Sequence, residues 1–480
     1  MKPAIKTAFG KEMSLAKEAY ASDQLNEAFR FLERAHILGQ RYFITHIITH
    51  WWMLKVGIRK TDWREIRGQI LRIIAVIPGY LFGWVPNGNT GGADVSALKP
   101  MPIPDDLATP LKGYNVWGDV FMRVVFWAFV AAITWVGMFS WSTYVRAGET
   151  RNIVSAFDGT CSPLTGFEGP EDLVWDREAG IVYAVGGDRR SFRAGGPGRA
   201  KIWSFPMTSP GSALPEDLAP AEPEIFRSFG MDLHIDEMGT RRLFVANRAS
   251  DGHTIEIFRL APSGGLSLER TLKHPLLRNP NDLVAIGKSE ALVTLDKQAD
   301  AGTLGEILEG ARQLRTGRVL RIDAMTAEYV ADGLQMANGI ALSPNQTELY
   351  VGETVAQRLS VFTYDSQTRT LSFNRHVPLD TGVDNITVNP DGRVYIAGHP
   401  KLLTLAMGYQ RSETSPSPSE VLVYNPSLGS VERFYINDGS EHSGGSVAIV
   451  DDASGRMLIG SAFGPHISDC KFSAAADSAL

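Results

Sequence analysis

The sequence has 480 residues, of which 44% are hydrophobic and 21% charged, and this composition excludes a disordered or fibrous protein. Its length suggests two or three domains, and its 47 glycines and 26 prolines indicate many turns. Residues 1–118 carry a net charge of +5 and the remainder carries −11, which argues against nucleic acid as a partner of the larger part.

Residues 1–85 are predicted to form a small α-helical domain. Apolar residues recur every three to four positions from Leu25 to Leu32, and a second apolar-rich stretch follows at residues 36–57. His46 and His50 are four residues apart and could share one metal ion on a helix, with His36 as a third candidate ligand. The sequence favours the alternative of two packed helices with partly exposed histidines, because no carboxylate or cysteine accompanies them. Residues 86–118 are interpreted as a linker, extended over its Gly- and Pro-rich first part.

One segment has the length and composition of a membrane span. The 22 residues from Val124 to Val145 carry no charge and are bounded by Arg123 and Arg146. They predict a transmembrane helix over residues 119–147, with a buried core helix as the alternative. The basic surplus before the span predicts a cytoplasmic N-terminal domain and an extracytoplasmic remainder, either periplasmic or extracellular.

The chain has two cysteines, Cys161 and Cys470, near the two ends of the region after the span. If they pair, the bridge requires an oxidising compartment. In a reducing compartment they would be two small buried apolar side chains. The residues alone leave both readings open.

A sequence pattern made of a polar residue, a short apolar strand, a turn and a second strand occurs six times in the region after the predicted span. Its copies start 46 to 63 residues apart, which is room for about four strands each. Such a repeat predicts a mainly β fold, a six-bladed β-propeller over residues 155–475, preceded by the helical domain and the transmembrane helix. The polar residues that open the copies are Glu171, His234, Asn281, Asn338, Asp384 with Asn385, and Ser446.

In a propeller the inner strands run along one axis, so these opening residues are expected to converge. Carboxylate and amide oxygens are the ligands that Ca²⁺ prefers, whereas zinc or copper would call for more histidine and cysteine. The sequence therefore predicts a calcium site on the axis. The alternative is a solvated channel in which these groups bond to one another and to water.

Several stretches in one order, PEDL, HPLLRNPNDLVAIG, ANGIALSP, VDNITVNPDG, GHPK and LIGSAF, resemble the paraoxonase/arylesterase family over residues 155–472. The resemblance implies a calcium-dependent hydrolase of small esters or lactones, with two calcium ions and a disulfide between Cys161 and Cys470. It implies a catalytic calcium held by Glu171, Asn281, Asn338, Asp384 and Asn385, and a structural calcium held by Asp172, Asp282 and the backbone carbonyl of Asp236. The N-terminal region, with its AHILGQ and GNTG stretches, is similar to a small bacterial family without an assigned function.

The same resemblance implies catalytic roles. His234 resembles the first of the family's two histidines and is expected to accept a proton from water, while calcium polarises the substrate carbonyl. His399 resembles a further histidine at the pocket, and Asn281 and Asn338 are expected to orient the carbonyl. Arg248 stands where the second histidine is expected, and arginine does not relay protons. The alternative is a non-catalytic or strictosidine-synthase-like propeller that acts as a binding module.

Overall fold

The computed structural model describes residues 1–112, 116–196, 198–211, 215–262, 264–299 and 303–473. They form two compact units, Met1–Ser140 and Trp141–Leu480. Residues 113–115 of the predicted linker and residues 474–475 at the end of the predicted propeller lie outside the described residues.

The first unit is helical, as predicted. Its first five helices are α1 (Pro3–Ala21), α2 (Leu25–Gly39), α3 (Phe43–Arg59), α4 (Trp63–Phe82) and α5 (Asp105–Leu111). Helices α1 to α4 each contact the next in chain order, and α1 to α3 share a core that includes Ala28, Leu32 and Met53, each fully buried. The 3.6-residue period of the sequence is thus the period of the buried face. Asp62 caps α4 by accepting hydrogen bonds from the backbone N–H groups of Arg64 and Glu65.

The segment after α4 is more ordered than the extended linker that its composition suggests. Residues 83–104 carry no helix or strand, but α5 follows them and buries Leu107 against Ile5, Ile37 and Leu38. Apolar residues of this proline-containing segment therefore pack against the helices.

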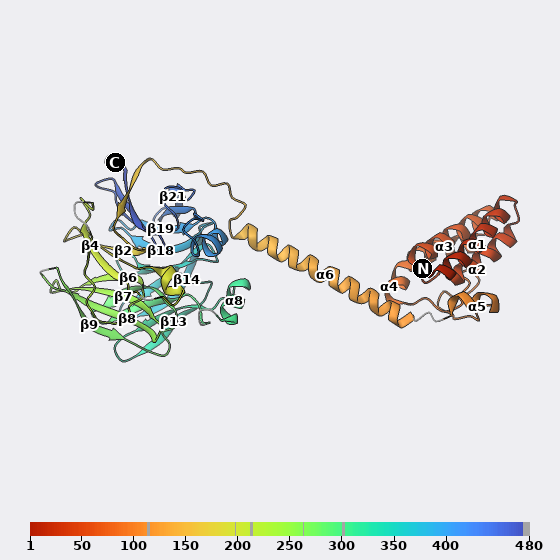
Figure 1. Cartoon of the computed structure of the whole chain (residues 1–480), viewed down its shortest axis with the longest axis horizontal. Helices are drawn as coiled ribbons and strands as arrows, with labels where there is room; N and C mark the ends of the chain where they lie inside the picture. Colours follow the sequence, from red (N-terminus) through yellow and green to blue (C-terminus); the bar gives the residue numbers. More distant parts are fainter. Residues whose placement is uncertain (113–115, 197, 212–214, 263, 300–302, 474–480) are drawn as a thin grey trace. The chain divides into compact units, whose positions relative to one another are not determined.

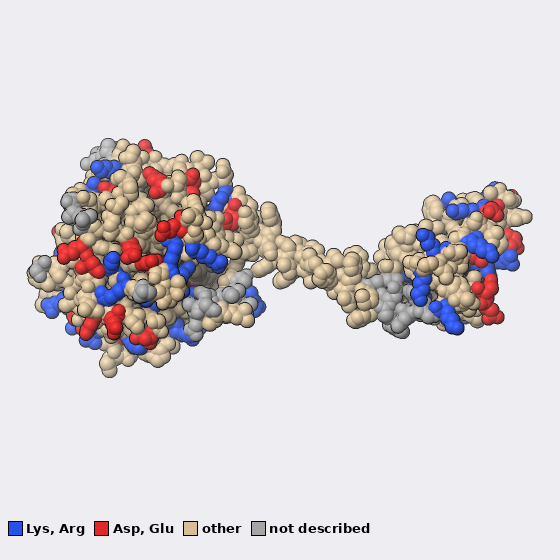
Figure 2. All heavy atoms as spheres, in the orientation of Figure 1, with Lys and Arg blue, Asp and Glu red and all other residues tan. Residues whose placement is uncertain are grey.

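Helix α6 (Val116–Arg146) contains a stretch from Val124 to Arg146 that is long and apolar enough to cross a membrane. Its mean hydropathy is 1.8, and none of it is buried among the described residues. Figure 2 shows the middle of this helix as uncharged surface.

The second unit is a six-bladed β-propeller, as predicted (Figure 1). Each blade is an antiparallel sheet of four strands. Blades 1 to 3 are made of β2 (Pro170–Asp176), β3 (Ile181–Gly186), β4 (Lys201–Pro206), β5 (Glu216–Asp217); β6 (Ser228–Ile235), β7 (Arg241–Ala249), β8 (Gly252–Leu260), β9 (Leu266–Leu272); and β10 (Pro280–Gly287), β11 (Glu290–Leu295), β12 (Gly317–Ile322), β13 (Ala327–Leu334). Blades 4 to 6 are made of β14 (Ala337–Leu342), β15 (Glu348–Glu353), β16 (Arg358–Asp365), β17 (Thr370–Pro378); β18 (Gly382–Val388), β19 (Val394–His399), β20 (Ser419–Asn425), β21 (Ser430–Asn437); and β22 (Gly445–Asp451), β23 (Arg456–Ser461), β24 (His466–Phe472), β1 (Gly159–Thr165). Short helices α7 (Arg189–Arg193), α8 (Leu304–Ala311) and the π-helix η1 (Thr404–Tyr409) lie between strands.

The inner strands β2, β6, β10, β14, β18 and β22 form a closed ring, in which each strand contacts the next. The second strands of the blades are buried on both faces, which is why their sequences are near-continuous apolar runs. Apolar clusters fill the space between neighbouring blades, for example where Phe244 and Ile257 of blade 2 pack with Val293 and Leu320 of blade 3.

Blade 6 joins the two ends of the propeller chain. Strand β1 pairs with β24, and Cys161 lies opposite Cys470 in the register. The two cysteines form a disulfide, as the family resemblance implied, across 309 residues of sequence. A bridge that closes so long a loop removes much of the entropy of the unfolded chain.

Candidate functional site: an oxygen-lined propeller axis

All six inner strands carry a register shift directly after their first or second residue. Such bulges re-aim side chains and are frequent beside active sites. The residues inside the shifts are Glu171, Phe229 with Gly230, Asn281 with Asp282, Asn338 with Gly339, Asp384 with Asn385, and Ser446. We call Glu171, Asn281, Asn338, Asp384, Asn385 and Ser446 the axial ring.

Contacts between blades bring members of the axial ring together. The backbone carbonyl of Glu171 in blade 1 accepts hydrogen bonds from Asn385 Nδ2 (3.3 Å) and Ser446 Oγ (2.6 Å) in blades 5 and 6. A Cβ atom on Gly339 in blade 4 would stand 2.4 Å from the carbonyl oxygen of Asp384, so only glycine permits this approach. Every member of the ring is at most 9% exposed.

The ring contains amide oxygens that lack a protein partner. Oδ1 atoms of Asn281, Asn338 and Asn385 are buried and accept no hydrogen bond from any described residue. The amide of Asn338 is oriented by its Nδ2, which donates to Thr354 Oγ1 at 3.2 Å. Buried unpaired oxygens cost free energy unless a ligand satisfies them, and oxygen donors of this kind suit a hard cation.

Asp172 and Asp282 lie beside the ring and fasten the blades to one another. Asp172 Oδ2 accepts from the backbone N–H of Met231 (2.6 Å), and Asp282 Oδ2 accepts from that of Ile340 (2.9 Å). Burial raises the pKa of both carboxyl groups well above the usual range. Repulsion from Glu171 adds to the shift of Asp172, and repulsion from Asp172 adds to that of Asp282. Burial likewise raises the pKa of Glu171 to about 7, although the nearby Arg189 guanidinium opposes this shift.

The structure places His399 at the ring. It ends β19 and pairs in register with Gly382, so its Nε2 lies 2.8 Å from Asp384 Oδ2. The residue is 4% exposed. The carboxylate accepts the Nε2 proton, which leaves Nδ1 with a lone pair and no hydrogen bond to the described protein.

The structure does not bring His234 to the ring. His234 pairs with Arg242 near the β6–β7 turn, five residues past Phe229 in the bulge of blade 2, or about 16 Å along the strand. The carbonyl oxygen of Asp236, expected at the deeper calcium, accepts instead from Gly239 N (2.8 Å) in that turn. The repeated pattern places its polar residue at the wrong end of β6, because the bulge of this strand holds Phe229 and Gly230, which offer no polar signal.

Phe229 occupies the place that His234 was expected to fill. The guanidinium groups of Arg189 and Arg248 each lie 3.9 Å from the centre of its ring. Arg189 also lies 3.2 Å from Glu171 Oε2, and Arg248 Nη2 binds Asp296 Oδ2 at 2.7 Å. Sequence reasoning noted Arg248 but missed Phe229 and Arg189; α7, which carries Arg189, is only five residues long.

These features define a class of protein, a closed six-bladed propeller whose axis is lined with buried carboxylate and amide oxygens. Residues 220–468 match the family model described as arylesterase, and residues 3–111 match the one described as protein of unknown function (DUF3703). The chain is 31% identical over 280 residues to serum paraoxonase/arylesterase 2 of Rattus norvegicus, a match that covers 55% of this chain and 77% of that protein. The chain belongs to the arylesterase family.

The chain is also similar to a second curated relative and to a solved structure. The chain is 30% identical over 327 residues to serum paraoxonase/lactonase 3 of Homo sapiens, covering 66% of this chain and 90% of that protein. Among solved structures, a luciferin-regenerating enzyme aligns with a TM-score of 0.44 and 14% identity over 65% of this chain and 95% of that one.

Proposed function

We propose that the propeller hydrolyses esters or lactones at the axial ring, with calcium as its cofactor. The observation that carries the proposal is the set of buried amide oxygens at Asn281, Asn338 and Asn385, which accept no hydrogen bond from the described protein. The relatives' names, paraoxonase, arylesterase and lactonase, support ester or lactone substrates.

The donor set fits calcium. Two carboxylates and three amide oxygens, from Glu171, Asp384, Asn281, Asn338 and Asn385, match the hard oxygen ligands of that ion. Asp172 and Asp282 would hold a second, structural ion, since two buried like charges require a counter-charge. A calcium ion bound at the ring supplies positive charge that polarises a carbonyl and stabilises an oxyanion.

The chain's own residues have separate tasks in this proposal. His399, held by Asp384 and with Nδ1 unpaired, is the candidate acceptor for the proton of the attacking water, the role that the sequence had assigned to His234. Asn281 and Asn338 orient the carbonyl. Phe229 supplies an apolar wall next to the ring, and its stacked arginines fix that wall in place.

A second candidate function is binding without turnover. Arg189 forms an ion pair with Glu171, and Phe229 replaces the imidazole that the sequence predicted on this strand. In that case calcium would serve rigidity alone.

Hydrolysis of phenyl acetate and of an aliphatic lactone by the purified full-length chain distinguishes the two. We expect turnover that a calcium chelator abolishes and calcium restores. His399→Gln is expected to lower kcat by about 10²-fold or more, the usual contribution of a positioned acid or base. His234→Gln is its matched control and is expected to keep the wild-type rate, because His234 lies at the far end of β6.

Absence of chelator-sensitive turnover on both substrates would favour the binding module. A slow His234 variant beside a fast His399 variant would reverse the assignment of the proton acceptor. Both variants are expected to keep the calcium-dependent rise in melting temperature, since neither imidazole is a proposed ligand.

We further propose that α6 anchors the chain in a membrane, with the N-terminal unit cytoplasmic and the propeller periplasmic or extracellular. The support is the apolar stretch from Val124 to Arg146 and the disulfide, which persists in oxidising compartments. The chain is expected to stay in the membrane fraction through alkaline carbonate washing. A thiol-specific mass label is expected to react with the cysteines after reduction only. Release of the chain by carbonate would contradict the membrane anchor. Labelling without reduction would contradict the orientation.

A further inference from the structure

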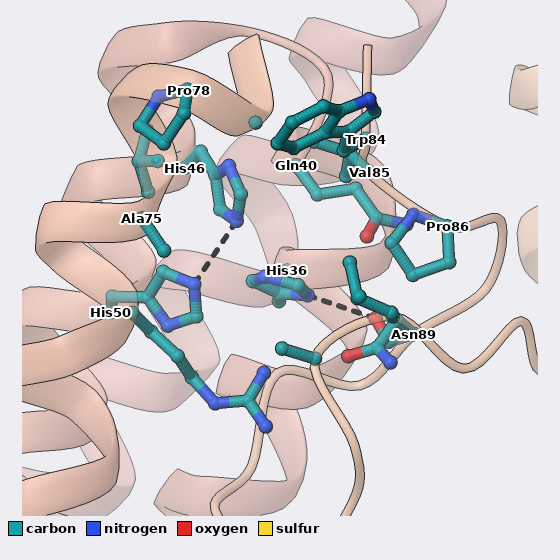
Figure 3. A pocket seen from close by; sticks show the side chains of 15 residues that line it. His36, Gln40, His46, His50, Ala75, Pro78, Trp84, Val85, Pro86 and Asn89 are labelled. Carbon is teal, nitrogen blue, oxygen red and sulfur yellow. Dashed lines mark hydrogen bonds between the residues drawn. The ribbon is translucent and has the colours of Figure 1, made fainter. Parts of the chain in front are cut away.

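The N-terminal unit contains a cluster of three buried histidines, distant in sequence from the propeller. His36 comes from α2, and His46 and His50 come from α3; they are 2%, 7% and 2% exposed. One ring nitrogen of each lies within 4.8 Å of the others, and the two Nε2 atoms of His46 and His50 are 3.0 Å apart (Figure 3). The third member, His36, is ten residues before His46 and reaches the pair because α2 packs on α3.

Hydrogen bonds set the protonation of two of the rings. His36 Nδ1 lies 2.8 Å from the carbonyl oxygen of Asn89, which can only accept, so Nδ1 carries the proton and Nε2 keeps its lone pair. His50 Nδ1 lies 2.6 Å from Gln69 Oε1. The amide of Gln69 is oriented by its Nε2, which donates to the carbonyl of Gly91 at 2.8 Å, so Oε1 accepts and the His50 Nε2 lone pair is also free to bind.

The described protein does not supply hydrogen-bond partners for all the ring nitrogens of this cluster. His46 Nε2 can donate to His50 Nε2, but His36 Nε2 and His46 Nδ1 then stay buried with no partner within the described part of the chain. A buried nitrogen without a hydrogen-bond partner destabilises the folded state. An ion placed among the three Nε2 atoms accepts the lone pairs of His36 and His50, and that of His46 once its proton moves from Nε2 to Nδ1.

Burial disfavours the charged form of all three imidazoles. Burial lowers the pKa of His36 to about 4 and lowers the pKa of His46 and His50 further. Three imidazoles with no carboxylate or thiolate among them suit zinc, copper, nickel or cobalt rather than calcium or magnesium.

The loop after α4 is built around His36. A Cβ atom on Gly91, whose φ is +84°, would stand 2.7 Å from Cγ of His36, so the backbone presses directly on the ring. Asn89, whose carbonyl holds His36, is itself fixed by Nδ2, which donates to the carbonyls of Ser96 and Lys99 at 2.9 Å. Partners that orient metal-binding imidazoles in this way are typical of metal sites. This gives the NGNTGG stretch a role that a linker would not need.

A cavity of about 260 Å³ opens beside the cluster and is lined by the three histidines, Pro78, Trp84 and Arg72 (Figure 3). Arg72 is held at the wall by its Nη2, which donates to the carbonyls of Gly92 (2.9 Å) and Val95 (2.6 Å). Three protein ligands leave a tetrahedral ion one open position. A guanidinium at the same cavity favours a small anionic ligand there.

We propose that His36, His46 and His50 bind one divalent transition-metal ion of the zinc class through their Nε2 atoms, with the fourth position open to the cavity for hydroxide or another small anion. The site is separate from the calcium proposed for the propeller, and it assigns chemistry to the family described as having unknown function.

The test uses the full-length chain in detergent, with an affinity tag that contains no histidine. The metal-free chain is loaded with Zn²⁺ and desalted, and we expect one equivalent of Zn²⁺ per chain to stay bound. Loading with Co²⁺ instead is expected to give the intense visible bands of a four-coordinate ion. One equivalent of Zn²⁺ is expected to abolish these bands. His36→Gln, His46→Gln and His50→Gln are each expected to weaken Zn²⁺ binding at least 100-fold. Gln69→Leu is expected to weaken it by about 10- to 100-fold, as for other groups that orient a ligand.

His442→Gln is the matched control, because His442 is a buried histidine of the propeller that faces Ser468 and Gly460, and it is expected to keep the full Zn²⁺ equivalent. Wild-type stoichiometry in the three cluster variants would overturn the proposal. If those variants fail to fold, the wild-type Co²⁺ spectrum decides: weak six-coordinate bands, or no bands, overturn it as well.

Discussion

Asp384→Ala is expected to abolish ester and lactone hydrolysis, with kcat/KM falling by about 10³-fold or more to the background rate. Two losses act together. The ring loses one of two carboxylates proposed to hold calcium, and His399 loses the oxygen that fixes its Nε2 proton at 2.8 Å. Leaving His399 buried without that partner also costs about 1–3 kcal/mol of folding free energy.

Steady-state hydrolysis of phenyl acetate and thermal unfolding, each with and without calcium, check this expectation. The melting temperature of Asp384→Ala in calcium is expected to coincide with or fall below that of calcium-free wild type. Asp158→Ala is the matched control, because Asp158 is exposed on the segment before β1 and is expected to change neither quantity. If Asp384→Ala kept calcium-stimulated activity at the wild-type rate, the axial ring would not be the catalytic site.

Most of the fold follows from periodicity in the sequence. The six-fold pattern located five of the six inner strands, because each of those has a polar residue near its start and continues as a buried apolar run; in blade 2 the pattern reached only the end of β6. Five of the six copies also gave the residue at the bulge. The exception is blade 2, where the bulge holds Phe229 and Gly230, and the nearest polar residue with a family resemblance, His234, lies five positions on.

What the sequence did not reveal depends on contacts between segments that no local pattern links. Arg189 reaches Glu171 from a short helix between β3 and β4. His36 meets His46 and His50 because of how α2 packs on α3 and how the Gly91 backbone closes on it, so the sequence favoured a packed helix pair and left the third ligand uncertain. Side chains brought together by tertiary packing are visible only once the elements are placed.

The calcium-free propeller is expected to lose stability as the pH rises from about 4 toward 7. Burial raises the pKa of Glu171 to about 7 and that of Asp232 to about 6, and it raises the pKa of Asp172 and Asp282 as well. A carboxyl group with a raised pKa in the folded state favours folding while it is protonated. That contribution is fully present below the pKa of the unfolded chain, near 4, and is lost as the pH rises through the folded value.

Bound calcium should reverse this trend, because it favours the ionised carboxylates. Each pKa unit corresponds to about 1.4 kcal/mol, so Glu171 alone would contribute on the order of 3 kcal/mol across this window. We expect the calcium-induced rise in melting temperature to be small at pH 5 and large at pH 8, measured in buffers freed of metal by resin. Asp172→Asn is expected to flatten the pH dependence of the calcium-free protein, since it removes one buried ionisable group and the repulsion that helps to raise the pKa of Asp282. A calcium effect equal at both pH values would mean that the buried carboxylates do not bind the ion.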